Sequence, residues 1–401
     1  MGAEKTKNII KDVVIVGMCR TAIGKFQGSL SSVPAVELAK TVSAAAIKRA
    51  GAAPENIDEV VLGTVYKHGM KGNPARQVQL ALGIPIAGAA VTVEQQCASS
   101  MRALEIACQQ IQLGKTEAAL VCGVESMSNV PYMLLNARKG FVIGPSRAED
   151  AMQYDALTDA FSGESIMRTA ENVAQKYNAS RKEQDEYALL SQQRADAAIK
   201  AGVFKEEIIP VEIKTRKGTV VFDTDEHPRA VTLQELSALK PAFMKDGTVT
   251  AGNASGINDG ASAAVIMSED KAKSLGLKPL ARILSTATAG CAPELMGIGP
   301  IYAIPKAIEL AGLQKGDIDY YEINEAFAAQ VVPCLKILEI PLGQVNANGS
   351  GIALGHPVGM TGLRLIISGY YELKRRGMKI GCASLCAGGG PAMAAVYEVI
   401  N

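Results

Sequence analysis

The chain has 401 residues, of which 48% are hydrophobic and 20% charged, a composition typical of a globular protein with a large core. Its 41 basic and 40 acidic residues nearly cancel, so no overall field exists to hold nucleic acid or an anionic membrane, and we expect neither as a partner. No uninterrupted apolar run is long enough to span a bilayer, and the charged stretch from Met1 to Lys11 lacks a signal-peptide core.

Eight cysteines are too few for a disulfide scaffold in a chain of this length, and most lie in apolar or glycine-rich surroundings. We therefore expect free thiols, a reducing compartment and a cytoplasmic location.

In chain order, β-branched runs alternate with alanine-rich helical stretches, which predicts an α/β fold. A charged region from about Ser126 to Thr248, with a helix over Ser180 to Ala201, interrupts this alternation and is interpreted as an inserted subdomain. The predicted elements are strands at Asp12–Gly17, Asp58–Leu62, Ala90–Val93, Tyr320–Ile323, Gln344–Asn346 and Ile380–Leu385, and helices at Ala35–Ala50, Met101–Leu113 and Leu363–Lys374.

An internal repeat divides the chain. Gly51 follows Ile47-Lys-Arg-Ala and Gly312 follows Ile308-Glu-Leu-Ala, and these two glycines are 261 positions apart, as are Ile57 and Ile318. The same offset carries Cys97 to within two residues of His356, and both precede a predicted helix. If the halves pack about a pseudo-twofold axis, Cys97 and His356 face each other.

Four short segments contain side chains suited to chemistry. Cys97 precedes a helix, where the helix dipole and a neighbouring imidazolium would lower its thiol pKa from about 8.5 and make it nucleophilic. His356 is the one histidine in a dense glycine context, Gly349 to Gly359. Cys386 and Gly388 lie in a glycine-rich loop after an apolar strand, which suggests an oxyanion pocket. Asn324 ends another buried strand and needs a polar partner.

Other sites are excluded by their missing residues. No complete dinucleotide-binding fingerprint, phosphate-binding loop or Gly-x-Ser-x-Gly elbow occurs. With only three histidines, a zinc site at Cys382 and Cys386 lacks further ligands at matching spacing, so we expect no metal.

Cys97-x-Ser99, Asn324-Glu-Ala-Phe327, Gly355-His356-Pro357 and Cys386-x-Gly388, in that order, resemble the four catalytic loops of the thiolase family. The resemblance covers nearly the whole chain and implies a five-layered α-β-α-β-α fold of two similar halves, assembled as a homodimer or homotetramer. The implied boundaries are residues 1–125 with 249–275 for the first half, 126–248 for a loop domain that binds CoA and contributes oligomer contacts, and 276–401 for the second half.

The resemblance also implies a ping-pong mechanism that joins or cleaves acyl groups carried on coenzyme A, with CoA as substrate or product and no resident cofactor. His356 accepts the proton of Cys97, the acyl group rests on Cys97, and Cys386 exchanges the α-proton of acetyl-CoA. His356 and a water on Asn324 stabilise the enolate, while the N–H groups of Cys97 and Gly388 stabilise the tetrahedral oxygen. Further implied substrate contacts are Ser255, Met296, Arg229, Ala251 and Phe327.

One departure affects the substrate. Short-chain thiolases carry a His-Met pair before Thr-Ala-Glu-Asn, where this chain has Ser165 and Ile166. We expect an acetyl-CoA acetyltransferase, with a 3-oxoacyl-CoA thiolase for a longer or functionalised acyl chain as the alternative. A decarboxylating condensing enzyme fits less well, because Cys386 supplies a base that such an enzyme need not have. A non-catalytic acyl-CoA-binding protein is the remaining alternative from another class.

Overall fold

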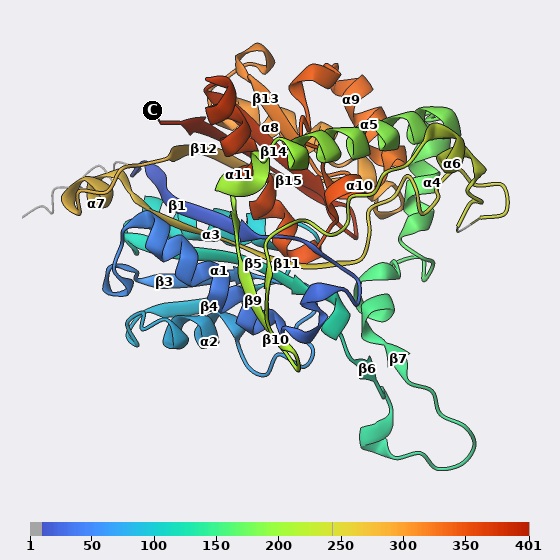
Figure 1. The fold of residues 1–401 in the computed structure, drawn as a ribbon, viewed down its shortest axis with the longest axis horizontal. Coiled ribbons are helices and arrows are strands. Elements are labelled where there is room, and N and C mark those ends of the chain that lie inside the picture. Colours follow the sequence, from blue (N-terminus) through green and yellow to red (C-terminus); the bar gives the residue numbers. More distant parts are fainter. Residues whose placement is uncertain (1–9, 243, 401) are drawn as a thin grey trace, which may run out of the picture.

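The computed structural model describes residues 10–242 and 244–400, so most of the amino-terminal stretch from Met1 to Lys11 lies outside the described residues. A large mixed sheet runs through both halves in the order β13-β14-β15-β12-β1-β11-β5-β3-β4 (Figure 1). The halves join where β1 and β12 pair over three residues. The strands are β1 (Val13–Thr21), β3 (Glu59–Gly63), β4 (Ala89–Val93), β5 (Ala118–Ser126), β11 (Asn258–Ser268), β12 (Ala281–Gly290), β13 (Tyr320–Ile323), β14 (Ile380–Cys386) and β15 (Pro391–Val399).

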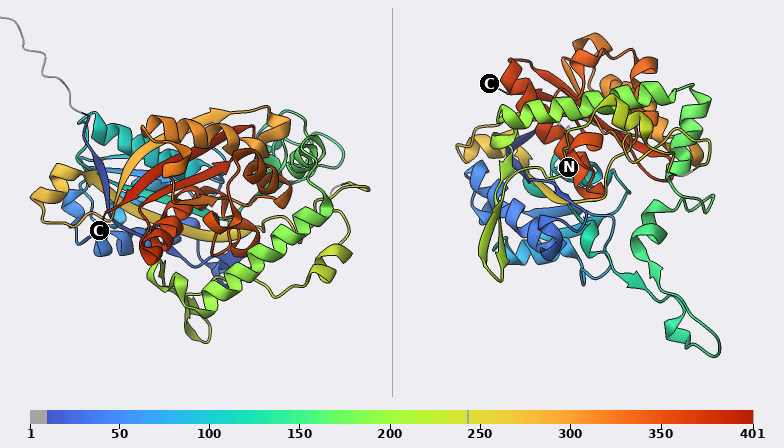
Figure 2. Two further views of the ribbon diagram at one scale, coloured as in Figure 1. Left: turned by 90° about the horizontal axis from the view of Figure 1, so that it is seen from above. Right: turned by 45° about the vertical axis from the view of Figure 1, so that its right-hand side comes forward.

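The helices complete five layers. Between the two parts of the sheet lie α3 and α11, which pack on each other and contact strands of both halves. One outer layer contains α1 and α2 against the first-half strands, and the other contains α8 against the second-half strands, with α9 packed on α8 (Figures 1 and 2). This is the α-β-α-β-α order that the resemblance implies. The helices are α1 (Ala35–Ala50), α2 (Pro74–Ala81), α3 (Ser99–Gln112), α8 (Pro300–Leu310), α9 (Ala328–Leu338) and α11 (Val358–Arg376).

Burial on both faces explains the apolar runs of the strands. In β1, Val13 and Ile15 point to the central helices, whereas Val14 and Val16 point to the outer layer around α1. Alternate side chains of a strand point to opposite faces, so a strand covered on both faces must be apolar throughout. The predicted α/β fold is therefore confirmed, and α1 begins and ends at the predicted residues.

The repeat is visible in matching contacts. Gly51 and Gly312, with φ of +66° and +70°, follow α1 and α8 in the left-handed conformation that glycine adopts at low cost. Asp58 accepts hydrogen bonds from the N–H groups of Glu117 and Ala118, and Asp319 accepts them from Lys379 and Ile380. Each aspartate thus ties the beginning of one parallel strand to that of its neighbour.

The predicted strand from Gln344 to Asn346 is wrong. Residues Leu342–Gln344 form a short 3-10 helix, and Val345 makes only an isolated bridge to Tyr321. Asn346 adopts a left-handed φ of +47°, and its side chain bonds both the N–H and the carbonyl of Ile323. A side chain here replaces the backbone ladder that a strand would need.

The segment between the halves wraps around one side of the molecule and extends an arm, residues 132–150, away from the body (Figures 1 and 2). Arg20 of β1 anchors this segment, because its buried guanidinium pairs with Asp225 and Glu207. Its strands and α-helices are β6 (Tyr132–Met133), β7 (Glu149–Asp150), α4 (Met167–Lys176), α5 (Arg181–Lys200), β8 (Ile208–Ile209), β9 (Val211–Thr215), β10 (Gly218–Phe222) and α6 (Leu233–Ala238). Outside this segment, the chain also forms the short strand β2 (Gly24–Lys25) and the short helices α7 (Glu269–Ser274) and α10 (Gly351–Leu354).

No helix within the described ranges is both long and apolar enough to cross a membrane.

Candidate active site

Cys97 lies in a tight turn between β4 and α3. Gln96, directly before it, has a left-handed φ of +47°, and the hydroxyl of Ser99 donates to the Gln96 carbonyl at 2.6 Å while accepting from the Gln95 N–H at 2.9 Å. A non-glycine residue held in this region of φ stores strain, a feature that clusters at functional sites. The turn thereby fixes Cys97 at the start of the central helix.

The sulfur of Cys97 faces groups from the second half of the chain. The backbone N–H groups of Gly388 and of Cys97 itself are directed at the sulfur, and both act to lower its pKa. Burial has the larger effect and raises the pKa of Cys97 to about 12. Cys97 also packs in one apolar cluster with Val358, two residues after His356. The structure therefore brings together the two loops that the internal repeat relates.

Cys386 ends β14 and is almost completely buried. Burial raises the pKa of its thiol well above the ordinary value, and the nearby Cys97 adds to this effect. A β-turn follows in which Gly389 and Gly390 adopt φ of +84° and +99°. The two thiols thus lie within electrostatic range of each other, one from each half.

His356 is held by three contacts. Its backbone N–H donates to Asn258 Oδ1 at 2.9 Å, its Nδ1 lies 2.7 Å from Thr361 Oγ1, and its Nε2 lies 3.3 Å from Asn324 Nδ2. The Thr361 hydroxyl donates to the Pro357 carbonyl at 2.9 Å, so toward His356 it acts as an acceptor and Nδ1 carries the proton. Nε2 is left with the lone pair that a base requires.

Asn324 directly follows β13, and its N–H donates to the Ser384 carbonyl at 2.9 Å. Its amide nitrogen points to His356, while its buried Oδ1 has no hydrogen-bond partner among the described residues. A buried polar atom without a protein partner is rare and indicates a role for water or ligand. This placement agrees with the expected position of Asn324 next to His356.

The imidazolium expected beside Cys97 is not present in the free protein at neutral pH. Burial lowers the pKa of His356 to about 3, and Arg364 adds to this effect. At neutral pH the ring is therefore a neutral imidazole, and no imidazolium is present to lower the pKa of Cys97. In the free protein, the pair consists of a thiol and a neutral base rather than a preformed thiolate and imidazolium.

A second cluster lies beside Cys386. Met296, Phe327 and Ile166 pack with Cys386 in one apolar group. A Cβ placed on Gly388 would lie 3.1 Å from Ile166, so this side chain lies directly beside the loop that faces Cys97. Ser255 is joined to the same region, because its N–H donates to the Ala326 carbonyl at 2.9 Å. Four of the predicted substrate contacts are thus brought together.

The other three predicted residues are not members of this apolar group, although Ser165 directly precedes Ile166 in the chain. Arg229 is exposed and donates to the Ala251 carbonyl at 2.7 Å, so these two predicted residues contact each other. Ser165 forms an isolated bridge with Thr158. Their substrate roles stay predictions.

Asn258 and Thr361 were missed in the sequence analysis, although both hold His356 in place. Asn258 stands three residues after Ser255, and Thr361 stands five residues after His356. Neither residue type signals such a contact by itself, since each depends on how the loops pack.

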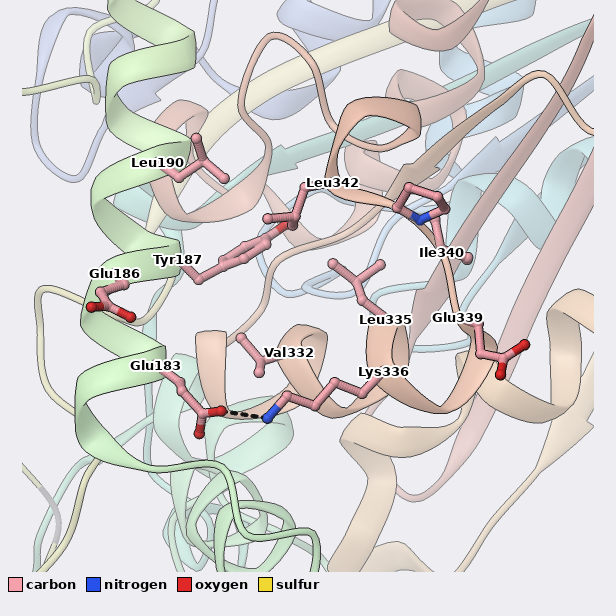
Figure 3. Close-up of a pocket in the computed structure, with 11 residues that line it drawn as sticks. Glu183, Glu186, Tyr187, Leu190, Val332, Leu335, Lys336, Glu339, Ile340 and Leu342 are labelled. Atoms are coloured by element: carbon pink, nitrogen blue, oxygen red, sulfur yellow. Dashed lines mark hydrogen bonds and ion pairs between the residues drawn. The ribbon is translucent and has the colours of Figure 1, made fainter.

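A groove of about 500 Å³ lies elsewhere, between α5 and α9 (Figure 3). Apolar side chains such as Leu190 and Val332 line it, and a Glu183–Lys336 ion pair crosses one end. None of the four reactive loops contributes to it. In the part of the chain that the structure describes, no group of three or more His, Cys, Asp or Glu residues is arranged to hold a metal.

Comparison with protein families matches the thiolase N-terminal domain to residues 13–270 and the thiolase C-terminal domain to residues 277–399. An acetyl-CoA acetyltransferase of Escherichia coli K12 is 48% identical over 98% of this chain and 100% of its own length. An acetyl-CoA acetyltransferase of Syntrophomonas wolfei is 45% identical over 97% of this chain and 100% of its own length.

Solved structures agree. The acetyl-CoA acetyltransferase of Syntrophomonas wolfei superposes with a TM-score of 0.96 at 48% identity, and human mitochondrial 3-ketoacyl-CoA thiolase with a TM-score of 0.94 at 40% identity. Each comparison covers 98% of this chain and 100% of the other. On its sequence, its fold and the order of its loops, the chain belongs to the thiolase family.

Proposed function

We propose that this chain is an acetyl-CoA acetyltransferase, which condenses two molecules of acetyl-CoA to acetoacetyl-CoA and free CoA and catalyses the reverse thiolysis. The observation that supports this proposal most strongly is that the thiols of Cys97 and Cys386 lie near each other. The N–H groups of Cys97 and Gly388 are directed at the sulfur of Cys97. The names of the full-length relatives support the same activity. CoA enters as substrate or product, and the proposal includes no resident cofactor or metal.

In the first half-reaction, Cys97 is the nucleophile and His356 the base. The thiol proton moves to Nε2, the sulfur attacks the thioester carbonyl, and the bond between that carbon and the CoA sulfur breaks. The leaving CoA sulfur takes the proton of Cys386, so the acyl-enzyme contains a Cys386 thiolate and a protonated His356. The N–H groups of Cys97 and Gly388 stabilise the oxyanion, and each such donor typically lowers the barrier by about 3 kcal/mol.

In the second half-reaction, the Cys386 thiolate removes the α-proton of a second acetyl-CoA. The carbanion attacks the acyl carbonyl, and the bond to Cys97 breaks. Cys386 gains the α-proton, and Cys97 leaves as the anion and regains its proton from His356, so both thiols and the neutral imidazole are restored. His356 and Asn324 stabilise the intervening enolate, and the raised pKa of Cys386 makes its thiolate a strong base.

The inserted segment, residues 126–248, is proposed to bind the CoA moiety together with Ser255 and Ala251. Ser255 would meet the pantetheine arm and Arg229 the nucleotide end, where a guanidinium suits phosphate. The exposure of Arg229 and its bond to Ala251 support this arrangement.

A homodimer or homotetramer is proposed, in which the arm carries contacts between protomers. Phe141, Val142 and Ile143 on the arm are 51%, 94% and 96% exposed, and they form an apolar patch that a single protomer leaves in water.

Light scattering on the purified protein should give a mass of two or four chains, and the double replacement Val142→Asp with Ile143→Asp should lower this mass. A single-chain mass for the unaltered protein would contradict the proposal.

The free cysteines support a reducing, cytoplasmic location. Detection of the protein outside the cytoplasmic fraction would contradict it.

Replacement Cys97→Ala should abolish both directions of the reaction, because no sulfur remains to carry the acyl group. We expect acetoacetyl-CoA thiolysis to fall by at least about 10⁴-fold, and mass spectrometry to detect no acetylated protein. The control is Cys108→Ala, a buried thiol on α3, which should retain activity. Undiminished acyl transfer in Cys97→Ala would refute the mechanism, and an unaltered protein that never forms an adduct would favour the binding-protein alternative.

The alkylation of Cys97 in the free enzyme should rise with pH without levelling off near neutrality. The folded pKa of its thiol is raised to about 12, so the thiolate fraction grows about tenfold per unit from pH 6 to pH 9. The pKa of His356, lowered to about 3, contributes no titration in this window. Iodoacetamide labelling with peptide mapping measures the rate, and a plateau near pH 7 would indicate a preformed thiolate.

The 3-oxoacyl-CoA thiolase alternative depends on Ile166, which lies beside Gly388 where short-chain relatives carry a methionine. Replacement Ile166→Ala should raise the ratio of kcat/KM for 3-oxohexanoyl-CoA over acetoacetyl-CoA by about tenfold, since one or two methylenes in a pocket contribute 1–3 kcal/mol. Leu310→Ala, at a 60% exposed position of α8, is the control. Faster cleavage of the longer substrate by the unaltered enzyme would move the assignment to the alternative.

A further inference from the structure

Glu125 is a fully buried carboxylate beside the candidate active site, and the mechanism above does not use it. It is the penultimate residue of β5 and stands 261 positions before Cys386, so the internal repeat makes the two residues equivalent. Cys386 lies at the end of β14, where it faces the start of α3. Glu125 has the corresponding place at the end of β5, and it faces the start of α11.

Both oxygens of Glu125 are saturated by uncharged donors. Oε1 accepts from the Thr64 hydroxyl at 2.9 Å and from the Tyr66 N–H at 3.1 Å. Oε2 accepts from the Val65 N–H at 2.8 Å and from the Gly359 N–H at 3.0 Å. Residues 64–66 follow β3 of the first half, whereas Gly359 is in the first turn of α11. One carboxylate therefore joins a loop of one half to a central helix of the other.

The fit around Gly359 leaves no room for adjustment. A Cβ at this position would lie 2.6 Å from Glu125 Oε2, 2.7 Å from Thr64 Cα and 2.7 Å from the Val124 carbonyl. The first turn of α11 thus rests directly on residues 64 and 124–125. Thr361 is two residues further along this helix, and its hydroxyl accepts a hydrogen bond from Nδ1–H of His356.

Burying a carboxylate without a cation is costly, which argues against a passive core residue. Burial raises the pKa of Glu125 to about 7 even though four donors act in the opposite direction. An apolar side chain could fill the same space, but it could not bind four donors on two loops. The four bonds are what distinguishes this residue from ordinary core packing.

We propose that Glu125 is a positioning residue for the acylation of Cys97: it clamps the start of α11 to residues 64–66 and thereby sets Thr361 and His356 so that Nε2 can reach the thiol. The inference rests on the proposed roles of Cys97 and His356. It assigns Glu125 no contact with substrate, and its effect should therefore fall on the rate of acylation and not on substrate binding.

The test uses Glu125→Gln, which keeps the size of the side chain but turns one acceptor into a donor. Since each oxygen accepts two bonds, the amide must lose two of the four. Rapid quenching with acetyl-CoA, followed by mass spectrometry, gives the rate of Cys97 acetylation. We expect this rate to fall at least tenfold with the apparent affinity for acetyl-CoA changed less than twofold. Glu59→Gln, at a buried acid on β3 whose carboxylate accepts a bond from Thr116, is the matched control and should acetylate normally.

A double-mutant cycle separates positioning from loss of stability. Thr361→Val alone should also slow acetylation, and the double variant should be no slower than the slower single variant, because both act through the same histidine. If Glu125→Gln does not fold, Thr64→Val removes one of the four bonds without altering a charge and should slow acetylation severalfold. Normal acetylation in Glu125→Gln or Thr64→Val, or independent multiplication of the two effects in the double variant, overturns the inference. Absence of acetylation in the unaltered enzyme instead refutes the proposed function.

Discussion

The arrangement of the candidate active site depends on two central helices, α3 and α11, whose first turns lie near each other. α3 and α11 pack against each other between the two parts of the sheet, and each starts beside strand ends of the opposite half. A helix start presents unpaired N–H groups and a partial positive charge. Bringing two such starts together creates a small region where developing negative charge is stabilised from both halves at once.

The repeat supplies one frame with two different sets of side chains. The aspartates Asp58 and Asp319 and the glycines Gly51 and Gly312 keep the same structural tasks in both halves. At the strand ends the residues differ: Glu125 occupies the position of Cys386. In the proposed mechanism, one half provides the nucleophile and the clamp, and the other provides both proton-transfer groups. A single reactive centre results, although the architecture is nearly symmetric.

The sequence predicts this frame well where the determinants are local or periodic. β1 and β14 could be recognised because strands that are buried on both faces have a continuous apolar run in the sequence. α1 could be recognised because its apolar residues recur with helical spacing and a glycine follows it. The prediction of a strand at Gln344–Asn346 failed because the Asn346 side chain, rather than the backbone, makes the bonds to Ile323. A single sequence does not reveal such a substitution.

The residues of the site could be named, but not their protonation. Position at a helix start predicted a thiolate for Cys97, yet burial outweighs the helix, and burial results from packing of segments that are distant in the sequence. Asn258 and Thr361 were missed for the same reason, since their contacts with His356 arise only when the loops meet. The substrate roles expected for Arg229 and Ser165 stay predictions.

The protonated state of Cys97 has a consequence for the lifetime of the enzyme. Peroxides and other cellular oxidants attack thiolates much faster than thiols, and the products beyond sulfenic acid are not restored by ordinary reductants. In the proposed mechanism, Cys97 ionises only when its proton passes to His356, so its thiol is shielded from this damage between turnovers. Its reactivity is confined to the moment when an acyl donor occupies the site.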